Sequence, residues 1–262
     1  MSRAQENLTS GQRRRLERFR TTRCIDLHCH CLPGLDDGPA TLDEAISLCR
    51  ALADDGITHV TATPHQLGRY DGRNEASQIR QAVGALNSDL ADQSVPLSII
   101  PGADVRLDER ILDLLHADRV MTLGDAGKHL LLELPHEIYI DLRPLVLRLA
   151  EAGITAIVSH PERHVALRRH PQRVSAWLDA GAILQITAGS LVGDFGGPAA
   201  ELAWHWLTGP HAAGTLVATD AHDVDRRPPR MTAAIDAIAE RLGHPVARRL
   251  CIENPALVYG ED

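Results

Sequence analysis

Short apolar runs alternate with amphipathic segments along most of this chain. Each run has three or four residues, and segments such as "HLLLELP" and "TAIVSHP" are continuously apolar at their centre. Continuous apolar runs of this length are typical of parallel strands buried on both faces of a sheet. The expected strands are Cys24–Leu27, Val60–Thr63, Leu97–Ile100, Leu130–Leu132, Ala156–Val158, Ile183–Ile186 and Leu216–Thr219.

Segments of helical periodicity lie between these runs. In 41–55, apolar residues recur every three or four positions, Asp43 and Glu44 lie in the first turn, and Gly56 follows the end. Gly56, Gly153 and Gly181 each follow an expected helix, where a left-handed cap is common. The strict alternation predicts one domain over 23–262, built on a parallel sheet that is closed or nearly closed. The expected helices are Thr41–Asp55, Arg73–Leu90, Asp108–Leu115, Leu142–Ala152, Gln172–Ala180, Ala199–Leu207 and Thr232–Leu242.

Six of the seven runs lead into a histidine or a carboxylate shortly after they end. The exception is 183–186, which ends at Thr187. In a parallel barrel the C-terminal ends of all strands open onto one face, so these side chains would converge although they are far apart in sequence. The converging residues are His28, His30, His65, Asp104, Glu133, His160, Asp220 and His222.

The histidine pair after the first run indicates a metal site. His28 and His30 are two residues apart, so on a strand both imidazoles point to the same side and can bind one ion. Asp36 and Asp37 follow in a loop, where one could cap a helix and the other bind metal, Asp37 being nearer the helix start. With Asp37 the candidate ligands number nine, more than one catalytic ion uses, so two or three ions are expected. Imidazole and carboxylate without thiolate suit Mn, Fe, Zn or Mg.

Arginines near the same face indicate a phosphate substrate. Arg163 follows His160, and Arg227 and Arg230 follow His222. A guanidinium can hold two phosphate oxygens in a bidentate fork. These three arginines are therefore candidate substrate-binding residues, and Arg163 and Arg227 lie directly after ligand strands.

Composition narrows the class of protein. A chain of 262 residues with 44% apolar content can bury one substantial core, and its formal charge of −8 argues against nucleic acid as a partner. The five cysteines are an odd number, which suits a reducing compartment. No apolar stretch approaches the roughly 20 residues that span a bilayer, and the N-terminus lacks the apolar segment of a signal peptide. A cytoplasmic protein is expected.

Residues 1–22 form a basic extension that differs from the rest of the chain. They carry six arginines, five of them within 13–20, and little apolar material to bury. Two interpretations stay open: a solvated helix ahead of the domain, or a basic arm that contacts an acidic partner or an anionic membrane surface.

A series of ordered motifs resembles one known family. The motifs are "DLHCHCLPGLDDGPATLDEA", "ATPHQ", "PGADVRL", "LLLELP", "VSHPERH", "QITAGSL", "ATDAH" and "ENP". Over about residues 23–260 they resemble the PHP-domain protein-tyrosine phosphatases of bacterial capsule and exopolysaccharide loci. The resemblance implies a distorted seven-stranded, TIM-like (β/α)7 barrel with a trinuclear, usually manganese-activated centre. It also implies, as substrate, the phosphotyrosine tail of a bacterial tyrosine kinase that controls polysaccharide export, and peripheral contact with that membrane-bound kinase.

The resemblance also assigns roles to single residues. It implies that one metal is held by His28, His30 and Asp220, with Asp104 bridging to a second metal completed by Glu133 and His160. A third metal would be held by Asp37, His65 and His222. Arg163 resembles the phosphate-binding arginine of the family, and Arg227 would be a second. This chain departs from the family pattern at Gln66, where a second histidine is frequent, and at Asp104, where glutamate is common.

Several rival functions remain to be weighed. Cysteine-based tyrosine phosphatases need an arginine six residues after the nucleophilic cysteine, and none of the five cysteines has one. A barrel amidohydrolase often bridges two metals with a carboxylated lysine, but the sole lysine, Lys128, lies before its strand. A small-molecule phosphatase of the same superfamily, such as one acting on histidinol phosphate, stays open. So does a binding protein that has lost activity, although ligand-type residues at nearly every strand end argue against it.

Overall fold

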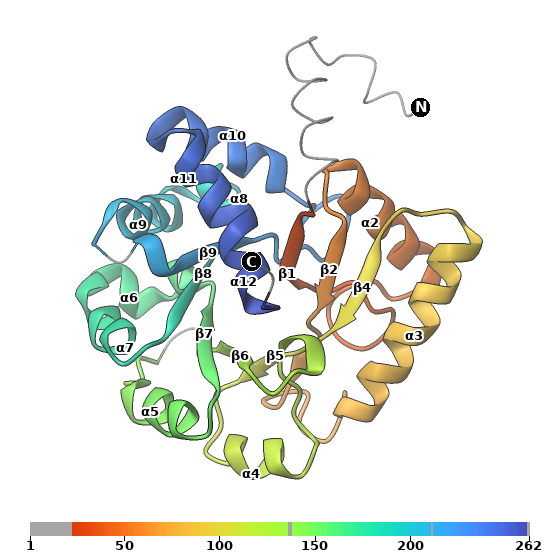
Figure 1. Cartoon of the computed structure of the whole chain (residues 1–262), viewed down its shortest axis with the longest axis horizontal. Coiled ribbons are helices and arrows are strands. Elements are labelled where there is room, and N and C mark those ends of the chain that lie inside the picture. The colour runs from red at the N-terminus through yellow and green to blue at the C-terminus, as the bar shows by residue number, and fades with distance from the viewer. Residues whose placement is uncertain (1–22, 136–137, 211, 261–262) are drawn as a thin grey trace.

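Two parallel sheets form the centre of this computed structural model, which describes residues 23–135, 138–210 and 212–260 (Figure 1). The basic extension 1–22 lies outside the described residues. The first sheet has the order β1-β2-β4 and the second the order β3-β5-β6-β7-β8-β9. The strands are β1 (Ile25–Cys29), β2 (His59–Ala62), β3 (His65–Gln66), β4 (Ser98–Pro101), β5 (Asp104–Arg106), β6 (His129–Glu133), β7 (Thr155–Ser159), β8 (Ile183–Thr187) and β9 (Thr215–Ala218).

All seven expected strands are present, but they do not form one seven-stranded sheet. β2 continues after a two-residue break into β3, and β4 does the same into β5. Pro64 lies in the first break and Gly102 in the second. Proline has no N–H to donate, and Gly102 lies so close to β2 that an added Cβ would be 2.6 Å from Thr61 Cγ2. β3 and β5 are therefore separate short strands, which lie beyond the ends of the strands expected over 60–63 and 97–100.

The two sheets also meet on the other side of the molecule. Cys29 at the end of β1 forms a parallel bridge with Ala221, just after β9, and His30 N–H donates to Ala221 O at 2.9 Å. With the continuity of β2 into β3 and of β4 into β5, the strands surround a common centre (Figure 1). The C-terminal ends of the strands consequently gather on one face.

Helices cover the outside of the strands. Each of the seven expected helices is present, although the one expected over 172–180 begins as a 3₁₀ turn over Pro171–Val174. Gly56, Gly153 and Gly181 all have positive φ, which confirms the left-handed caps. The helices are α2 (Leu42–Asp54), α3 (Ala76–Asp92), α4 (Ile111–His116), α5 (Arg143–Glu151), α6 (Val165–Arg169), α7 (Ser175–Asp179), α8 (Ala188–Leu191), α9 (Gly197–Thr208), α10 (Met231–Leu242), α11 (His244–Arg248) and α12 (Asn254–Val258).

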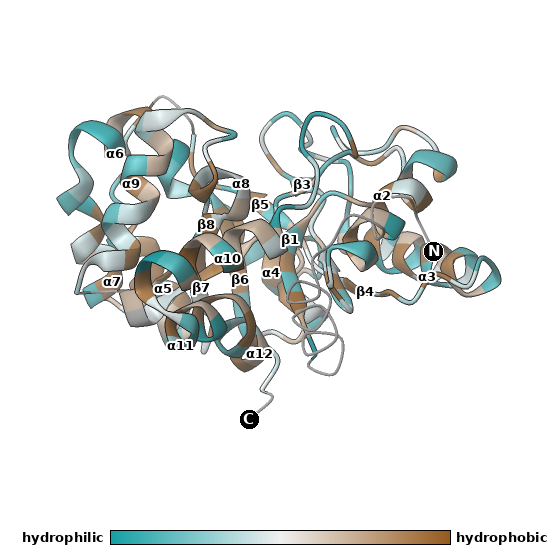
Figure 2. Cartoon of the chain, turned by 90° about the horizontal axis from the view of Figure 1, so that it is seen from above, coloured by the Kyte–Doolittle hydropathy of each residue, from teal (hydrophilic) through white to brown (hydrophobic). Residues whose placement is uncertain are grey.

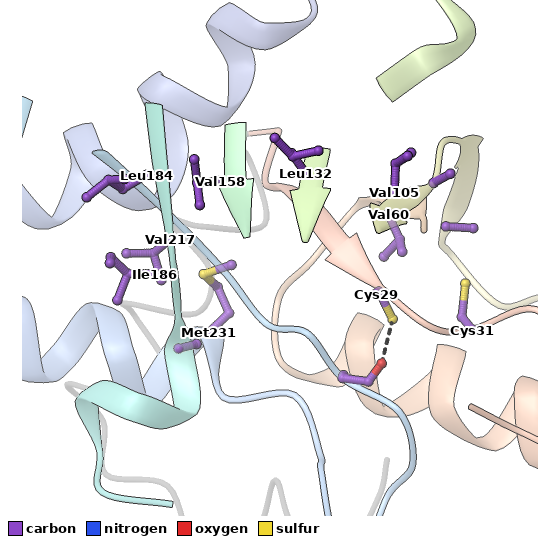
Figure 3. Packing of buried hydrophobic residues seen from close by; sticks show 14 of the residues in the cluster. Cys29, Cys31, Val60, Val105, Leu132, Val158, Leu184, Ile186, Val217 and Met231 are labelled. Carbon is purple, nitrogen blue, oxygen red and sulfur yellow. Dashed lines mark hydrogen bonds between the residues drawn. The ribbon is translucent and has the colours of Figure 1, made fainter. Parts of the chain in front are cut away.

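The hydrophobic core has two parts. The larger lies between the strands and the surrounding helices and includes Cys29 and Cys31 (Figure 3). The smaller fills the ring of strands, where Leu27 and Leu131 pack with Val258 of α12. Figure 2 shows α12 and the loop that bears β3 on opposite sides of the molecule. α12 therefore covers one end of the ring and leaves the C-terminal strand ends to the other. Among the described residues, no helix is long and apolar enough to cross a bilayer.

Candidate metal centre and phosphate-binding cavity

The C-terminal strand ends bring all nine predicted ligands together. They form four overlapping groups, and within each group one possible ligand atom per residue lies within 4.8 Å of the others. Because neighbouring groups share His28, His30, His65 and Asp104, the four form one continuous cluster. The groups are His30–Asp37–His65–His222, His28–Asp104–His160, His28–His30–Asp220 and His65–Asp104–Glu133.

Hydrogen bonds fix the orientation of the first two histidines. Gln185 Oε1 accepts from the backbone N–H of His160 at 3.1 Å, which identifies this atom as the oxygen of the amide. His28 Nδ1 is 2.9 Å from the same oxygen and must donate to it. His30 Nδ1 lies 2.5 Å from the carboxylate of Asp36 and donates there. Both Nε2 atoms therefore point into the cluster, as ligand nitrogens do when a second residue holds the other ring nitrogen.

The two Nε2 atoms are 3.1 Å apart, so their lone pairs would repel each other unless a positive charge lies between them. Burial lowers the pKa of His28 to about 3 despite the nearby Asp220. Burial alone would also lower the pKa of His30, but Asp36 and Asp220 raise it to about 10. The cluster consequently attracts a cation, and a metal ion can replace a proton at such a position.

Buried carboxylate oxygens without partners support the same conclusion. Both oxygens of Asp104 and Oδ1 of Asp220 are buried and have no hydrogen-bond partner among the described residues. Asp104 Oδ2 is 3.7 Å from His28 Nε2, 3.5 Å from His65 Nδ1 and 3.8 Å from His160 Nε2. Burial and the neighbouring Glu133 raise the pKa of Asp104, because two carboxylates share one dry site. Divalent cations would satisfy these oxygens, so the residues present fit metal ions.

The structure separates the roles of the two loop aspartates. Asp36 is buried behind His30 and accepts from its Nδ1 and from the backbone N–H of His65. Asp37 points into the cluster, where its Oδ1 is 3.4 Å from His65 Nε2 and 3.5 Å from His222 Nε2. Neither residue caps the following helix, because Thr41 forms the capping box of α2 with Glu44. Asp37 is therefore the candidate ligand, and the suggestion that one aspartate is a helix cap was wrong.

Two of the candidate ligands have a strained backbone conformation that orients their side chains. His160 and Asp220, the residues after the ends of β7 and β9, have φ values of 34° and 53°. This left-handed region costs a residue with a Cβ roughly 1–2 kcal/mol. The neighbouring structure maintains it: Asp220 N–H donates to His28 O at 2.7 Å, and His160 N–H donates to Gln185. Such strain is common where a side chain must be held in a functional direction.

Arg163 and Arg227 meet at Asp220. Each donates an Nη2 hydrogen bond of 2.5 Å to Asp220 Oδ2, and the Nε–H of each is buried without a partner among the described residues. Burial alone would raise the pKa of Asp220, but the guanidinium groups and His28 hold it well below its usual value. Two guanidinium groups that are fixed on one carboxylate and line the cavity can hold an anion beside the cluster.

Local turns bring these arginines to the site. Glu162 is buried and accepts from Thr187 N–H at 3.1 Å and from Ser190 Oγ at 2.7 Å, which fixes the turn that carries Arg163. The loop after His222 folds back because Asp223 Oδ1 accepts from the backbone N–H of Arg227. The structure does not bring Arg230 to the site: at the start of α10 its Nε donates to the exposed Asp194 at 2.8 Å.

A cavity of about 340 Å³ opens over the cluster. Its lining includes Asp37, His65 and Asp220 together with Arg163 and Arg227. The size falls within the range of about 300–1,000 Å³ that is usual for small-molecule sites. A small ligand in this cavity can therefore contact both the candidate metal ligands' ions and the two arginines.

Sequence reasoning missed several residues of this site. Gln185 gave no signal, because it lies inside an apolar strand. Arg106 follows Asp104 by two residues on β5, lines the cavity and pairs with Glu133 at 3.0 Å. Arg69 and Tyr70 line the cavity from the loop after β3. The strand-end pattern for Asp104 could have found Arg106, since residues two apart on a strand share a face.

Gln66, the departure from the family pattern, binds backbone rather than the cluster. Its Nε2 donates to Asn74 O at 2.6 Å and to Arg119 O at 3.0 Å, and its Oε1 accepts from Met121 N–H at 2.9 Å. These bonds use the whole amide, so Gln66 fixes the loop that follows β3.

The side chains that the rival mechanisms need are not among the described residues that line the cavity. Lys128 is exposed and precedes β6, at the opposite end of the strand from Glu133. All five cysteines are buried and free. Burial raises the pKa of Cys29 to about 11, and its thiol donates to Ala221 O (Figure 3). A carboxylated lysine bridge and a cysteine nucleophile therefore find no support in the described residues.

A parallel α/β fold with imidazoles, carboxylates and arginines at its strand ends defines a metal-dependent hydrolase. The chain belongs to the family described as capsular polysaccharide synthesis, CpsB/CapC, whose family model matches residues 24–259. Tyrosine-protein phosphatase YwqE of Bacillus subtilis (strain 168) is 31% identical over 236 residues, covering 89% of this chain and 91% of that protein. Tyrosine-protein phosphatase CpsB of Streptococcus pneumoniae is 28% identical over 239 residues, covering 88% and 96%.

Solved structures agree with this membership. A crystal structure from work on YwqE of Bacillus subtilis and CpsB of Streptococcus pneumoniae, described as unique metal-dependent tyrosine phosphatases, superimposes with a TM-score of 0.85 at 29% identity. That match covers 91% of this chain and 95% of the other. A mutant organophosphorus hydrolase from Deinococcus radiodurans superimposes with a TM-score of 0.57 at 13% identity, covering 92% and 94%. The second likeness concerns the fold alone.

Proposed function

We propose that this protein is a metal-dependent protein-tyrosine phosphatase that hydrolyses phosphotyrosine on a bacterial tyrosine kinase and so regulates capsule or exopolysaccharide synthesis. The observation that carries the proposal is the meeting of Arg163 and Arg227 at Asp220, beside a cluster of ligand atoms that attracts cations. The similarity to proteins named tyrosine-protein phosphatases supplies the substrate class.

The proposed cofactor is two or three divalent ions, with manganese as the preferred metal and iron, zinc or magnesium as alternatives. The nine clustered residues would hold them: His28, His30 and Asp220 on one ion, Asp104 as the bridge, Glu133 and His160 on the second, and Asp37, His65 and His222 on the third. When bound, clustered ions supply an activated water and neutralise phosphate oxygens.

The arginines would bind and orient the phosphate. Arg163 and Arg227 each keep one donor on Asp220 and both line the cavity, so their planes are fixed before substrate arrives. Charge on these oxygens grows toward the transition state, so fixed donors lower the barrier more than they strengthen ground-state binding. Arg106, which pairs with Glu133, would line the same cavity.

Further parts of the proposal concern fold and location. The seven principal strands, with β2 and β4 extended by β3 and β5, support description as a distorted (β/α)7 barrel. The five free thiols support a reducing, cytoplasmic location. A kinase tail on the cytoplasmic side of a membrane would be reached by peripheral contact.

The deciding experiment compares phosphate release from phosphotyrosine, phosphoserine and histidinol phosphate, with and without Mn²⁺. The proposal expects metal-stimulated turnover with phosphotyrosine preferred, whereas a preference for histidinol phosphate would favour a small-molecule phosphatase. The variant His28→Ala should lose bound metal and nearly all activity while keeping its fold by circular dichroism. His116→Ala, at the exposed end of α4, is the matched control and should retain both. Full metal content in His28→Ala would contradict the proposed site.

A further inference from the structure

The lining of the cavity is unevenly divided between charged and uncharged side chains. Nine of its 13 described lining residues are histidines, carboxylates or arginines. The other four are Gln66, the last residue of β3, and Leu67, Gly68 and Tyr70 of the loop that follows it. Leu67 and Tyr70 therefore give one segment of the described lining an apolar wall that an entering aryl ring can contact.

The loop is held firmly enough to serve as such a wall. Its start is fixed by Gln66, and its end by Asn74, whose Nδ2 donates to Leu35 O at 2.8 Å and to His65 O at 3.0 Å. Leu67 and Asn74 both have positive φ, 64° and 53°. Strained residues persist where the surroundings over-determine them, which is frequent in ligand-binding segments. Tyr70 N–H closes a tight turn by donating to Leu67 O at 2.9 Å.

Tyr70 connects this wall to the candidate metal centre. Its ring stacks on the imidazole of His65, with centroids 5.7 Å apart and planes 16° apart. The guanidinium of Arg69 lies 4.8 Å from the centroid of the Tyr70 ring, and Arg69 Nη2 donates to Asp37 at 2.9 Å. Tyr70 is only partly covered by these neighbours and still lines the cavity.

We propose that Tyr70, supported by Leu67, is the specificity-determining residue that contacts the aromatic ring of the substrate and selects aryl over alkyl phosphate esters. This inference rests on the proposed function. Arg163 and Arg227 come from other segments and contact the phosphate, which every phosphate ester shares, so they cannot distinguish the two classes. A contact with Tyr70 can, because an alkyl ester has no ring to place against it.

The test measures binding of two inert probes to the metal-loaded protein by titration calorimetry. Phenylphosphonate carries a ring and methylphosphonate does not, while both present the same anion to the arginines and metals. The variant Tyr70→Ala should weaken phenylphosphonate about 2- to 12-fold, the factor that an aromatic contact of about 0.5–1.5 kcal/mol is worth. Methylphosphonate should bind as to wild type, and Tyr70→Phe should retain both affinities. Arg73→Ala, exposed on the same loop and outside the lining, is the matched control.

Two results would overturn the inference. Equal weakening of both probes in Tyr70→Ala would show that Tyr70 acts by supporting His65, and unchanged binding of both would show that it contacts no ring. Methylphosphonate binding and metal content also reveal a variant that has lost its site. A wild type that binds phenylphosphonate preferentially but does not hydrolyse phosphotyrosine would contradict the proposed function and leave the assignment of Tyr70 standing.

Discussion

Gln185 Oε1 accepts a hydrogen bond from His28 Nδ1 at 2.9 Å, and this contact joins the middle of β8 to the end of β1. Because the same oxygen accepts the backbone N–H of His160, one buried amide orients a histidine from β1 and the turn after β7. The contact fixes the tautomer of His28, so that its Nε2 faces the cluster. In many metal sites such supporting residues set affinity nearly as strongly as the ligands do.

Replacing Gln185 tests this relationship. Gln185→Leu should lower metal affinity roughly 10–100-fold, the usual cost of losing a residue that orients a ligand. Gln185→Glu keeps an acceptor for both partners and should bind metal more tightly than the leucine variant. Competition with a chelator measures the affinities, and circular dichroism checks the fold. Wild-type affinity in Gln185→Leu would mean that packing alone orients His28.

Asp36 and Asp37 allow a second test, which distinguishes a metal ligand from a residue that orients a ligand. Asp36→Asn should weaken metal binding moderately, because the carboxylate that holds His30 Nδ1 becomes a neutral amide. Asp37→Asn should remove the metal of the His30–Asp37–His65–His222 group, because its carboxylate oxygen lies inside that group. Metal counts by mass spectrometry of the native protein should therefore drop for Asp37→Asn and stay complete for Asp36→Asn at saturating metal. A lower metal count for Asp36→Asn than for Asp37→Asn would mean that Asp36 is the ligand and Asp37 the supporting residue.

The sequence predicted the strands and most of the gathered side chains because the physics there is local. An apolar run followed by a histidine or carboxylate identifies a strand and its C-terminal end together, and a parallel arrangement then requires the ends to meet. The short strands β3 and β5, beyond Pro64 and Gly102, were not predicted, because the expected apolar runs end before both breaks and no further run marks these strands.

Roles that depend on contacts between distant segments could not be predicted from the sequence. Asp36 and Asp37 differ by one position in a loop, and only the turn that buries one behind His30 separates their roles. In the sequence, Gln185 is only a polar residue within an apolar strand. Its role becomes clear from its contact with His28 of β1. Arg230 follows the same motif as Arg227, but the fold-back of the loop ends before it, so its guanidinium reaches Asp194.

Cysteine should take no part in catalysis. Cys29 is fully buried with a raised pKa, and its sulfur faces Ala221 rather than the cavity. Cys29→Ser and Cys31→Ser should therefore keep kcat within a few-fold of wild type per folded molecule. Rapid acid quench during turnover, followed by mass spectrometry, should find no phosphorylated cysteine, and trapping one would overturn the metal-water mechanism.

Asp55 should make stability depend on pH far from the cluster. Its carboxylate accepts from the backbone N–H groups of Met231 at 2.6 Å and Thr232 at 3.2 Å, and burial raises its pKa from 3.8 to about 6. The folded state then holds the proton more tightly than the unfolded state, so the free energy of unfolding should fall as pH rises from about 4 to 6. The difference between wild type and Asp55→Asn in urea unfolding should shift by on the order of 1 kcal/mol over this range. A pH-independent difference would contradict the raised pKa.

Arg163 should contribute to the transition state rather than to metal binding. Its guanidinium is fixed on one side by Asp220 and on the other by the ring of Phe195, 4.7 Å from the ring centroid. Arg163→Ala should lower kcat/KM for phosphotyrosine by roughly 10²–10³, the range seen when one charge-stabilising donor is removed. Lysine at this position should restore only part of the loss, because a point charge does not reproduce the planar fork.

Two controls accompany the prediction for Arg163→Ala. Arg169→Ala removes an exposed arginine from the adjacent helix α6 and should leave kcat/KM unchanged. Metal content of Arg163→Ala should equal that of wild type, because Asp220 keeps its hydrogen bond to Arg227 and its Oδ1 still faces His28 at 3.3 Å. Loss of metal together with activity would mean that Arg163 supports Asp220 as a ligand. Full activity would mean that Arg227 alone holds the phosphate, or that the substrate is not a phosphate ester.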